Sequence, residues 1–116
     1  MDFEEIWTTD VARLSGETIK TFRGKENKIL SVSMKGIMRT TSEKPEPSLM
    51  PIEPFRWAVD RLLTTGRVTR HEIDSKFTTD GCSSGVFAVL SLVPLFEVGT
   101  DSLATLHLRK QDKEKT

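Results

Sequence analysis

The residues best suited to nucleophilic or acid–base chemistry in this chain are two histidines, His71 and His107, and a single cysteine, Cys82. A Cys–His pair acts as a nucleophile only when both side chains meet and a third group orients the base. Nothing in the sequence brings these residues together, because His71 falls in the first turn of one expected helix and His107 in the last expected strand. Cys82 precedes another helix, whose start would stabilise a thiolate. We therefore predict no catalytic residue and a protein that is not an enzyme.

The same residues make a poor metal site. A structural zinc site takes four Cys or His ligands at short, regular spacings, whereas this chain has three such residues in all. The run Gly81–Gly85 is rich in Gly and Ser, but no lysine follows it, so it does not match a nucleotide-binding P-loop. We expect no metal and no cofactor. Ser83 and Ser84, at the start of a helix, are suited to contact a single phosphate.

Basic side chains are the remaining candidates for a binding site. The chain of 116 residues has 17 Lys plus Arg and 17 Asp plus Glu, so it has no net charge, unlike strongly basic nucleic-acid proteins. The charge is unevenly spread: segment 17–44 has seven basic and three acidic residues, and segment 1–16 has one basic and four acidic residues. Lys25 and Lys28 could lie along a phosphate backbone and release counterions. The alternative is a solvated sheet face whose lysines discourage aggregation.

The elements that must position these side chains follow from the hydrophobic pattern of the second half. A helix is predicted from Pro54, with its apolar stripe facing inward and Gly66 ending it. A second helix begins at Thr69, which forms a capping-box pattern with Glu72 three residues later. Arg67 and Arg70 flank that start and are placed for phosphate contacts.

A third helix is predicted after Gly81, ending before Pro94. Its inward stripe is Val86, Val89, Leu90 and Val93. Its other face, which we expect to point outward, consists of Ser84, Phe87, Ala88 and Ser91. Two strands joined by a turn follow, and the second leads to Arg109.

Helix, turn, helix, turn, helix and two strands is an order that resembles the winged helix-turn-helix superfamily. The resemblance covers residues 51–108 and is one of architecture, with no family-specific motif. It implies that the third helix would lie in the major groove of DNA. The outward face lacks the Arg, Asn and Gln that usually read base edges, so any readout of sequence would be weak.

The first half is predicted to be a helix followed by β-structure. An amphipathic helix spans Asp2–Leu14, and a three-stranded antiparallel meander follows, in which Leu30, Val32 and Met34 alternate inward. The fold class is therefore α+β. We divide the chain into a helix-and-meander lobe over 1–44, a Pro-rich linker over 45–50, a winged-helix-like unit over 51–109 and a flexible tail over 110–116. Whether both lobes share one core is left open.

Two functions are compatible with this reading. The first is a DNA-binding module dominated by phosphate contacts. The residues expected to make these contacts are Arg67, Arg70, Ser83, Ser84, Arg109, Lys25 and Lys28. The second is a protein-interaction or adaptor module that binds no nucleic acid and docks a partner on Ser84, Phe87, Ala88 and Ser91, with Phe87 as the apolar anchor. Fold-level analogy favours double-stranded DNA, and either function could be carried out by a homodimer.

The location of the protein is predicted from what the sequence lacks. A single cysteine allows no disulfide within the chain, which fits a reducing compartment. No apolar run has the length of a membrane span, and the acidic start is unlike a signal peptide. We therefore expect a cytoplasmic protein without a membrane partner.

Overall fold

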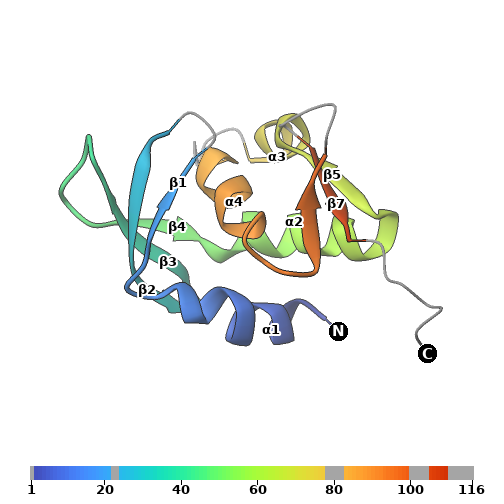
Figure 1. Cartoon of the computed structure of the whole chain (residues 1–116), viewed down its shortest axis with the longest axis horizontal. Helices are drawn as coiled ribbons and strands as arrows, with labels where there is room; N and C mark the ends of the chain where they lie inside the picture. The colour runs from blue at the N-terminus through green and yellow to red at the C-terminus, as the bar shows by residue number, and fades with distance from the viewer. Residues whose placement is uncertain (1, 22–23, 78–82, 100–104, 110–116) are drawn as a thin grey trace.

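The computed structural model describes residues 2–21, 24–77, 83–99 and 105–109. It confirms the predicted α+β class. A four-stranded antiparallel sheet, called sheet A here, has the order β1-β2-β3-β4, and a three-stranded sheet, called sheet B, has the order β5-β7-β6. Figure 1 shows sheet A at one end of the molecule, sheet B towards the other end, and helix α4 between them.

The predicted N-terminal helix is present, but its geometry changes along its length. It begins as α1 (Phe3–Glu5), continues as a π-helix, η1 (Ile6–Val11), and ends as a 3₁₀-helix, η2 (Ala12–Leu14). Trp7 is buried and its ring contacts Phe55, with the centroids 5.0 Å apart. The guanidinium of Arg56 lies 4.8 Å from the centre of the Phe3 ring. These contacts join the first helix to the second half of the chain.

Sheet A is formed by β1 (Thr18–Lys20), β2 (Glu26–Ser33), β3 (Gly36–Thr41) and β4 (Ser48–Pro51). Its inner face, towards the helices, carries buried side chains from all four strands: Ile19, Asn27, Ile29, Ile37 and Met50. A bulge between Ile29 and Ser31 shifts the register of β2 against β3. The predicted inward alternation is wrong at Leu30, which follows the inward-facing Ile29 and is 39% exposed, and at Met34 in the following turn, which is 51% exposed.

The predicted linker over 45–50 is wrong in its last three residues. Ser48–Pro51 forms β4 and pairs with β3, with Met50 opposite Ile37. Proline can occupy the edge of a sheet, where its missing N–H is tolerated, and β4 is an edge strand. Gly36 is needed for this close pairing, because a Cβ there would lie 2.0 Å from the Met50 carbonyl oxygen. The backbone of Gly36 also has a φ of 140°.

The first helix of the second half is α2 (Ile52–Thr65), which begins two residues before the predicted Pro54 and ends at Gly66 in the left-handed conformation. A short strand, β5 (Arg67–Thr69), replaces the predicted turn and leads into α3 (Arg70–Lys76). The predicted capping box is confirmed. The Thr69 hydroxyl accepts the Glu72 N–H at 3.0 Å, and the Glu72 carboxylate accepts the Thr69 N–H at 2.8 Å.

The rest of the chain consists of α4 (Ser83–Leu90), β6 (Phe96–Val98) and β7 (Thr105–Leu108). The central strand of sheet B is β7, which pairs antiparallel with β5 and with β6. Buried residues from the N-terminal helix, both sheets and α2 to α4 belong to one hydrophobic cluster. The two expected lobes thus share a core in the described part of the chain.

Candidate functional site

Helix α4 is enclosed, which corrects the expected outward face. Phe87 is 1% exposed and Ala88 is 3% exposed, whereas we expected both to point outward. Every residue from Gly85 to Leu90 is buried. A helix that is apolar all round lies inside a protein. The uninterrupted apolar run Val86–Leu90 shows that pattern in the sequence.

The inner face of sheet A covers the start of α4. A Cβ on Gly85 would lie 2.6 Å from the Met50 sulfur and 2.8 Å from a terminal nitrogen of Arg39. Arg39 also donates a hydrogen bond of 2.6 Å to the side-chain carbonyl of Asn27. On its other sides α4 contacts α2 and α3. Among the described residues, Gly85–Leu90 of the helix that would enter a DNA groove thus present no open face to base edges or to another helix.

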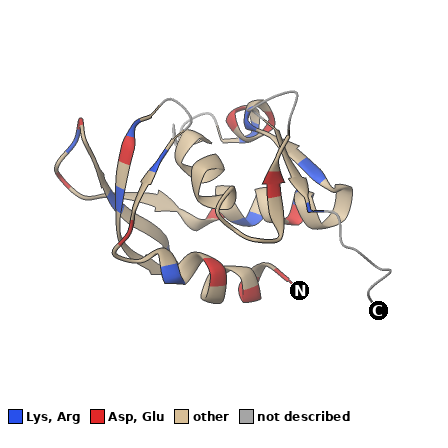
Figure 2. Ribbon diagram, viewed as in Figure 1, with Lys and Arg blue, Asp and Glu red and all other residues tan. Residues whose placement is uncertain are grey.

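The residues predicted to contact phosphate do not form one surface. Arg67 is on β5, in sheet B, and Arg70 begins α3 next to it. Lys25 and Lys28 belong to the region of sheet A, at the other end of the molecule (Figures 1 and 2). Of the two serines at the start of α4, Ser84 is exposed and Ser83 is half-buried.

Two of the residues predicted to contact phosphate instead form ion pairs with carboxylates. The Lys25 ammonium lies 2.8 Å from the Glu43 carboxylate, and its hydrogen bond lowers the pKa of Glu43. Arg109 contacts Glu97 at 3.2 Å and donates to the carbonyl of Pro94.

Arg67 and Arg70 are different. Within the described residues, neither makes an ion pair or a side-chain hydrogen bond. Of the residues predicted to contact phosphate near sheet B, Arg67 and Arg70 are therefore the cations that have no acidic partner among the described residues.

The residues considered for chemistry stay apart or lie outside the described chain. His71 is exposed on α3, and His107 lies on β7 opposite Arg67 and Glu97. Cys82 is not among the described residues. Within the described ranges, no three His, Cys, Asp or Glu side chains are close enough to hold a metal ion.

The outer face of sheet A carries an apolar surface that the sequence did not reveal. A bulge places two residues of one strand opposite one residue of its neighbour, so Leu30 and Ser31 together oppose Met38. Met38 in turn opposes Leu49 on β4. Leu49 is 46% exposed and Met38 is half-buried. We call Leu30, Met38 and Leu49 the apolar row.

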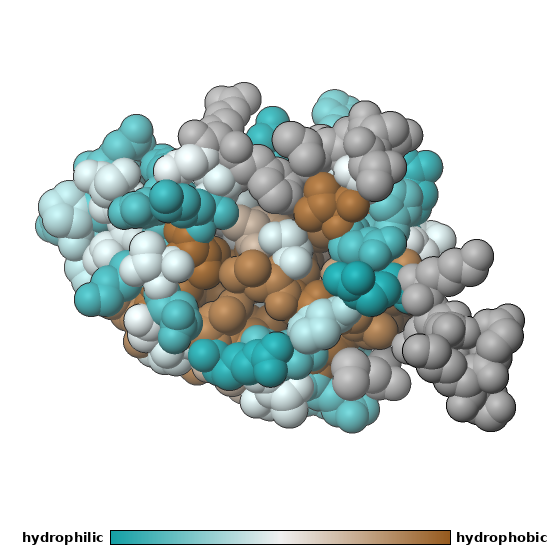
Figure 3. Space-filling view, in the orientation of Figure 1, coloured by the Kyte–Doolittle hydropathy of each residue, from teal (hydrophilic) through white to brown (hydrophobic). Residues whose placement is uncertain are grey.

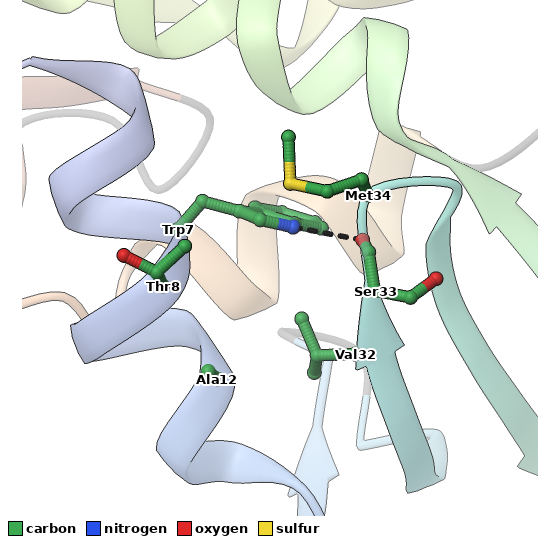
Figure 4. Close-up of a pocket in the computed structure, with 6 residues that line it drawn as sticks. All are labelled: Trp7, Thr8, Ala12, Val32, Ser33 and Met34. Carbon is green, nitrogen blue, oxygen red and sulfur yellow. Dashed lines mark hydrogen bonds between the residues drawn. The ribbon is translucent and has the colours of Figure 1, made fainter.

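A separate pocket of about 180 Å³ lies between the N-terminal helix and the β2–β3 hairpin (Figure 4). Its lining residues come from two segments far apart in the sequence: Trp7, Thr8, Ala12, Val32, Ser33 and Met34. The Trp7 indole N–H donates to the Ser33 carbonyl at 2.9 Å. The sequence predicted the amphipathic helix over Asp2–Leu14 but gave no sign of this pocket, because the pocket depends on the turn after β2.

The surface in the orientation of Figure 3 has hydrophobic residues gathered near its centre and polar residues around them. No helix among the described residues is long and apolar enough to cross a membrane. Comparison with protein families, curated proteins and solved structures gives no match to this chain.

Proposed function

We propose that the chain is a non-enzymatic protein-interaction module whose docking face is the outer side of sheet A. The observation that supports this most is the enclosure of α4. A winged-helix-like unit normally uses its third helix for recognition, and here that helix stabilises the interior instead. The apolar row remains as an exposed surface formed by three adjacent strands.

The proposed occupant is an amphipathic helix of a partner protein with acidic residues beside its apolar stripe. A sheet with an apolar face buries that face against another element, and a helix is a common solution. Strands lie about 4.8 Å apart, so the row spans roughly 10 Å, which is the width of one helix. Lys28 shares the outer face with Leu30, and Lys35 lies in the adjoining turn; both are exposed. Among the described residues, neither lysine forms an ion pair.

A designed helical peptide with a leucine stripe and glutamate flanks tests this proposal, measured by fluorescence anisotropy. We expect it to bind the wild-type chain, and we expect Leu49→Asp to weaken binding at least about tenfold, which corresponds to about 1.4 kcal/mol. Leu92→Asp is the matched control, since Leu92 is equally exposed at 48% but lies outside sheet A. Equal binding of a lysine-flanked peptide, equal loss in both variants, or no binding would contradict the proposal.

Duplex DNA binding through phosphates is the second candidate. The element order from α2 to β7, together with the strand order β5-β7-β6, supports a winged-helix type of unit. Arg67 and Arg70, without carboxylate partners in the described chain, are the cations that this function would use.

A gel shift with random duplex DNA at two salt concentrations distinguishes this candidate. Removing two phosphate contacts by Arg67→Ala plus Arg70→Ala should weaken binding and reduce the salt slope by about 2. Lys20→Ala plus Lys44→Ala, two exposed lysines in the region of sheet A, is the matched control. Full affinity in the arginine double variant rules out this assignment.

A further inference from the structure

We propose that the pocket beside Trp7 is a second protein-binding site, which receives one apolar side chain from a polypeptide with basic residues next to that side chain. The inference rests on the proposed function in that the ligand is a protein. It uses a different surface, however, and a partner of opposite charge. The chain would then join two partners, one on sheet A and one at its N-terminal helix.

The size of the pocket sets the size of the ligand. Sites for drug-sized molecules have volumes of about 300–1,000 Å³, and an apolar cavity of about 150 Å³ accommodates benzene. At about 180 Å³, this pocket holds one aromatic or large aliphatic side chain. That is the size of an anchor residue in a protein interface.

The pocket favours an apolar group because the Trp7 and Thr8 donors that line it are already hydrogen-bonded within the chain. The Trp7 indole donates to the Ser33 carbonyl, and the Thr8 hydroxyl donates to the Glu4 carbonyl at 2.7 Å. The Ser33 hydroxyl accepts the Lys35 N–H at 3.2 Å. A polar ligand would lose its hydration without gaining these partners, whereas an apolar side chain loses nothing.

The walls of the pocket are suited to closing around a ligand. One wall belongs to the π-helical segment η1, a geometry that is rare and occurs frequently at functional sites. The other includes Met34, which is 51% exposed. Methionine has an unbranched, adaptable side chain that fits irregular partners. In Figure 4 Met34 and Val32 lie on the same side of the pocket, opposite the helix.

The charge on the helical side argues for a basic partner. Residues 2–9 include three exposed carboxylates, of Asp2, Glu4 and Glu5, and no basic side chain. Glu4 is one turn before Thr8, which lines the pocket. Further along, Arg13 lies 3.8 Å from Asp10 and is thus compensated. Figure 2 shows the acidic residues along this helix. Lys35 follows Met34 on the other wall of the pocket. The partner's basic residues should therefore lie on the side of its apolar anchor that faces the N-terminal helix.

Methyl NMR of isotope-labelled methionine tests the inference, because Met34, Met38 and Met50 report on the pocket, sheet A and the core. The probe is the capped peptide Lys-Lys-Phe-Ser-Ser. Two matched peptides replace either both lysines by glutamate or the phenylalanine by alanine. We expect saturable movement of the Met34 signal with the first peptide alone, while Met50 stays unchanged.

Two variants locate the binding. Ala12→Phe places a ring in the pocket and should abolish the Met34 response. Glu4→Gln plus Glu5→Gln leaves the pocket intact and should weaken binding roughly three- to tenfold, since exposed charge pairs are individually weak. An unchanged Met34 signal, equal responses to the matched peptides, or full affinity in the double variant would overturn the inference. If Met38 still responds to the acidic helical peptide, the pocket alone is refuted; if neither responds, the proposed function fails too.

Discussion

Replacing Phe87 by alanine tests the enclosure of α4 through its energetic consequence. A buried aromatic side chain removes about 150–250 Å² from water, which at about 25 cal/mol per Å² amounts to roughly 4–6 kcal/mol. Measured Phe→Ala losses in protein cores are about 3–5 kcal/mol. With Phe87 1% exposed, we expect Phe87→Ala to lower the free energy of unfolding by about 3–5 kcal/mol in urea titrations followed by circular dichroism.

The same substitution at Phe77 is the matched control. Phe77 is half-buried and its ring meets Trp57 edge-on, with centroids 6.1 Å apart, so we expect a loss of about 2 kcal/mol. Both losses are a large fraction of the roughly 5–15 kcal/mol that stabilises a whole domain. Urea titration should therefore distinguish the free energies of unfolding of the two variants. If Phe87→Ala costs less than Phe77→Ala, α4 does present its Phe87 face to solvent and the reasoning is refuted.

Two further predictions concern Gly36 in β3 and Glu72 in α3. Gly36→Ala should cost at least about 3 kcal/mol in the same titration, because a positive φ costs about 1–3 kcal/mol and the new Cβ would meet the Met50 carbonyl; a loss below about 1 kcal/mol would contradict the β3–β4 pairing. Glu72→Gln should destabilise the protein more at about pH 7 than at about pH 3. The Thr69 N–H, and then Arg61 at 2.6 Å, hold the pKa of Glu72 below its ordinary value of 4.5, so this stabilisation is present above that value and is lost as the pH falls below it. A pH-independent difference between variant and wild type would rule out this role.

The sequence predicted best what depends on neighbouring residues. The capping box of Thr69 and Glu72 and the left-handed end of α2 at Gly66 are local, because the interacting groups lie within one helical turn. The inward stripe of α4 was also right, since Val86, Val89 and Leu90 are buried.

What the sequence did not predict depends on contacts between distant segments. The apolar stripe of α4 predicted that one face of the helix is buried. The start of α4 is also covered by sheet A, at Met50 and Arg39, which are far from α4 in the sequence. The bulge beside Ile29 places Leu30 and Ser31 together opposite Met38, and the pairing of Met38 with Leu49 completes the apolar row. Strand β4 was not predicted because Pro47 precedes it and Pro51 is its last residue, and proline is confined to the edges of sheets. The candidate docking surfaces result from these non-local pairings.

The enclosure of α4 is tested most directly by solvent paramagnetic relaxation of alanine methyl groups. Ala58 is fully buried in α2, and Ala12 is half-buried beside the pocket, so the two provide internal references. We predict that a soluble paramagnetic probe relaxes the Ala88 methyl as little as that of Ala58. Relaxation of Ala88 equal to or greater than that of Ala12 would show an open third helix and contradict the account.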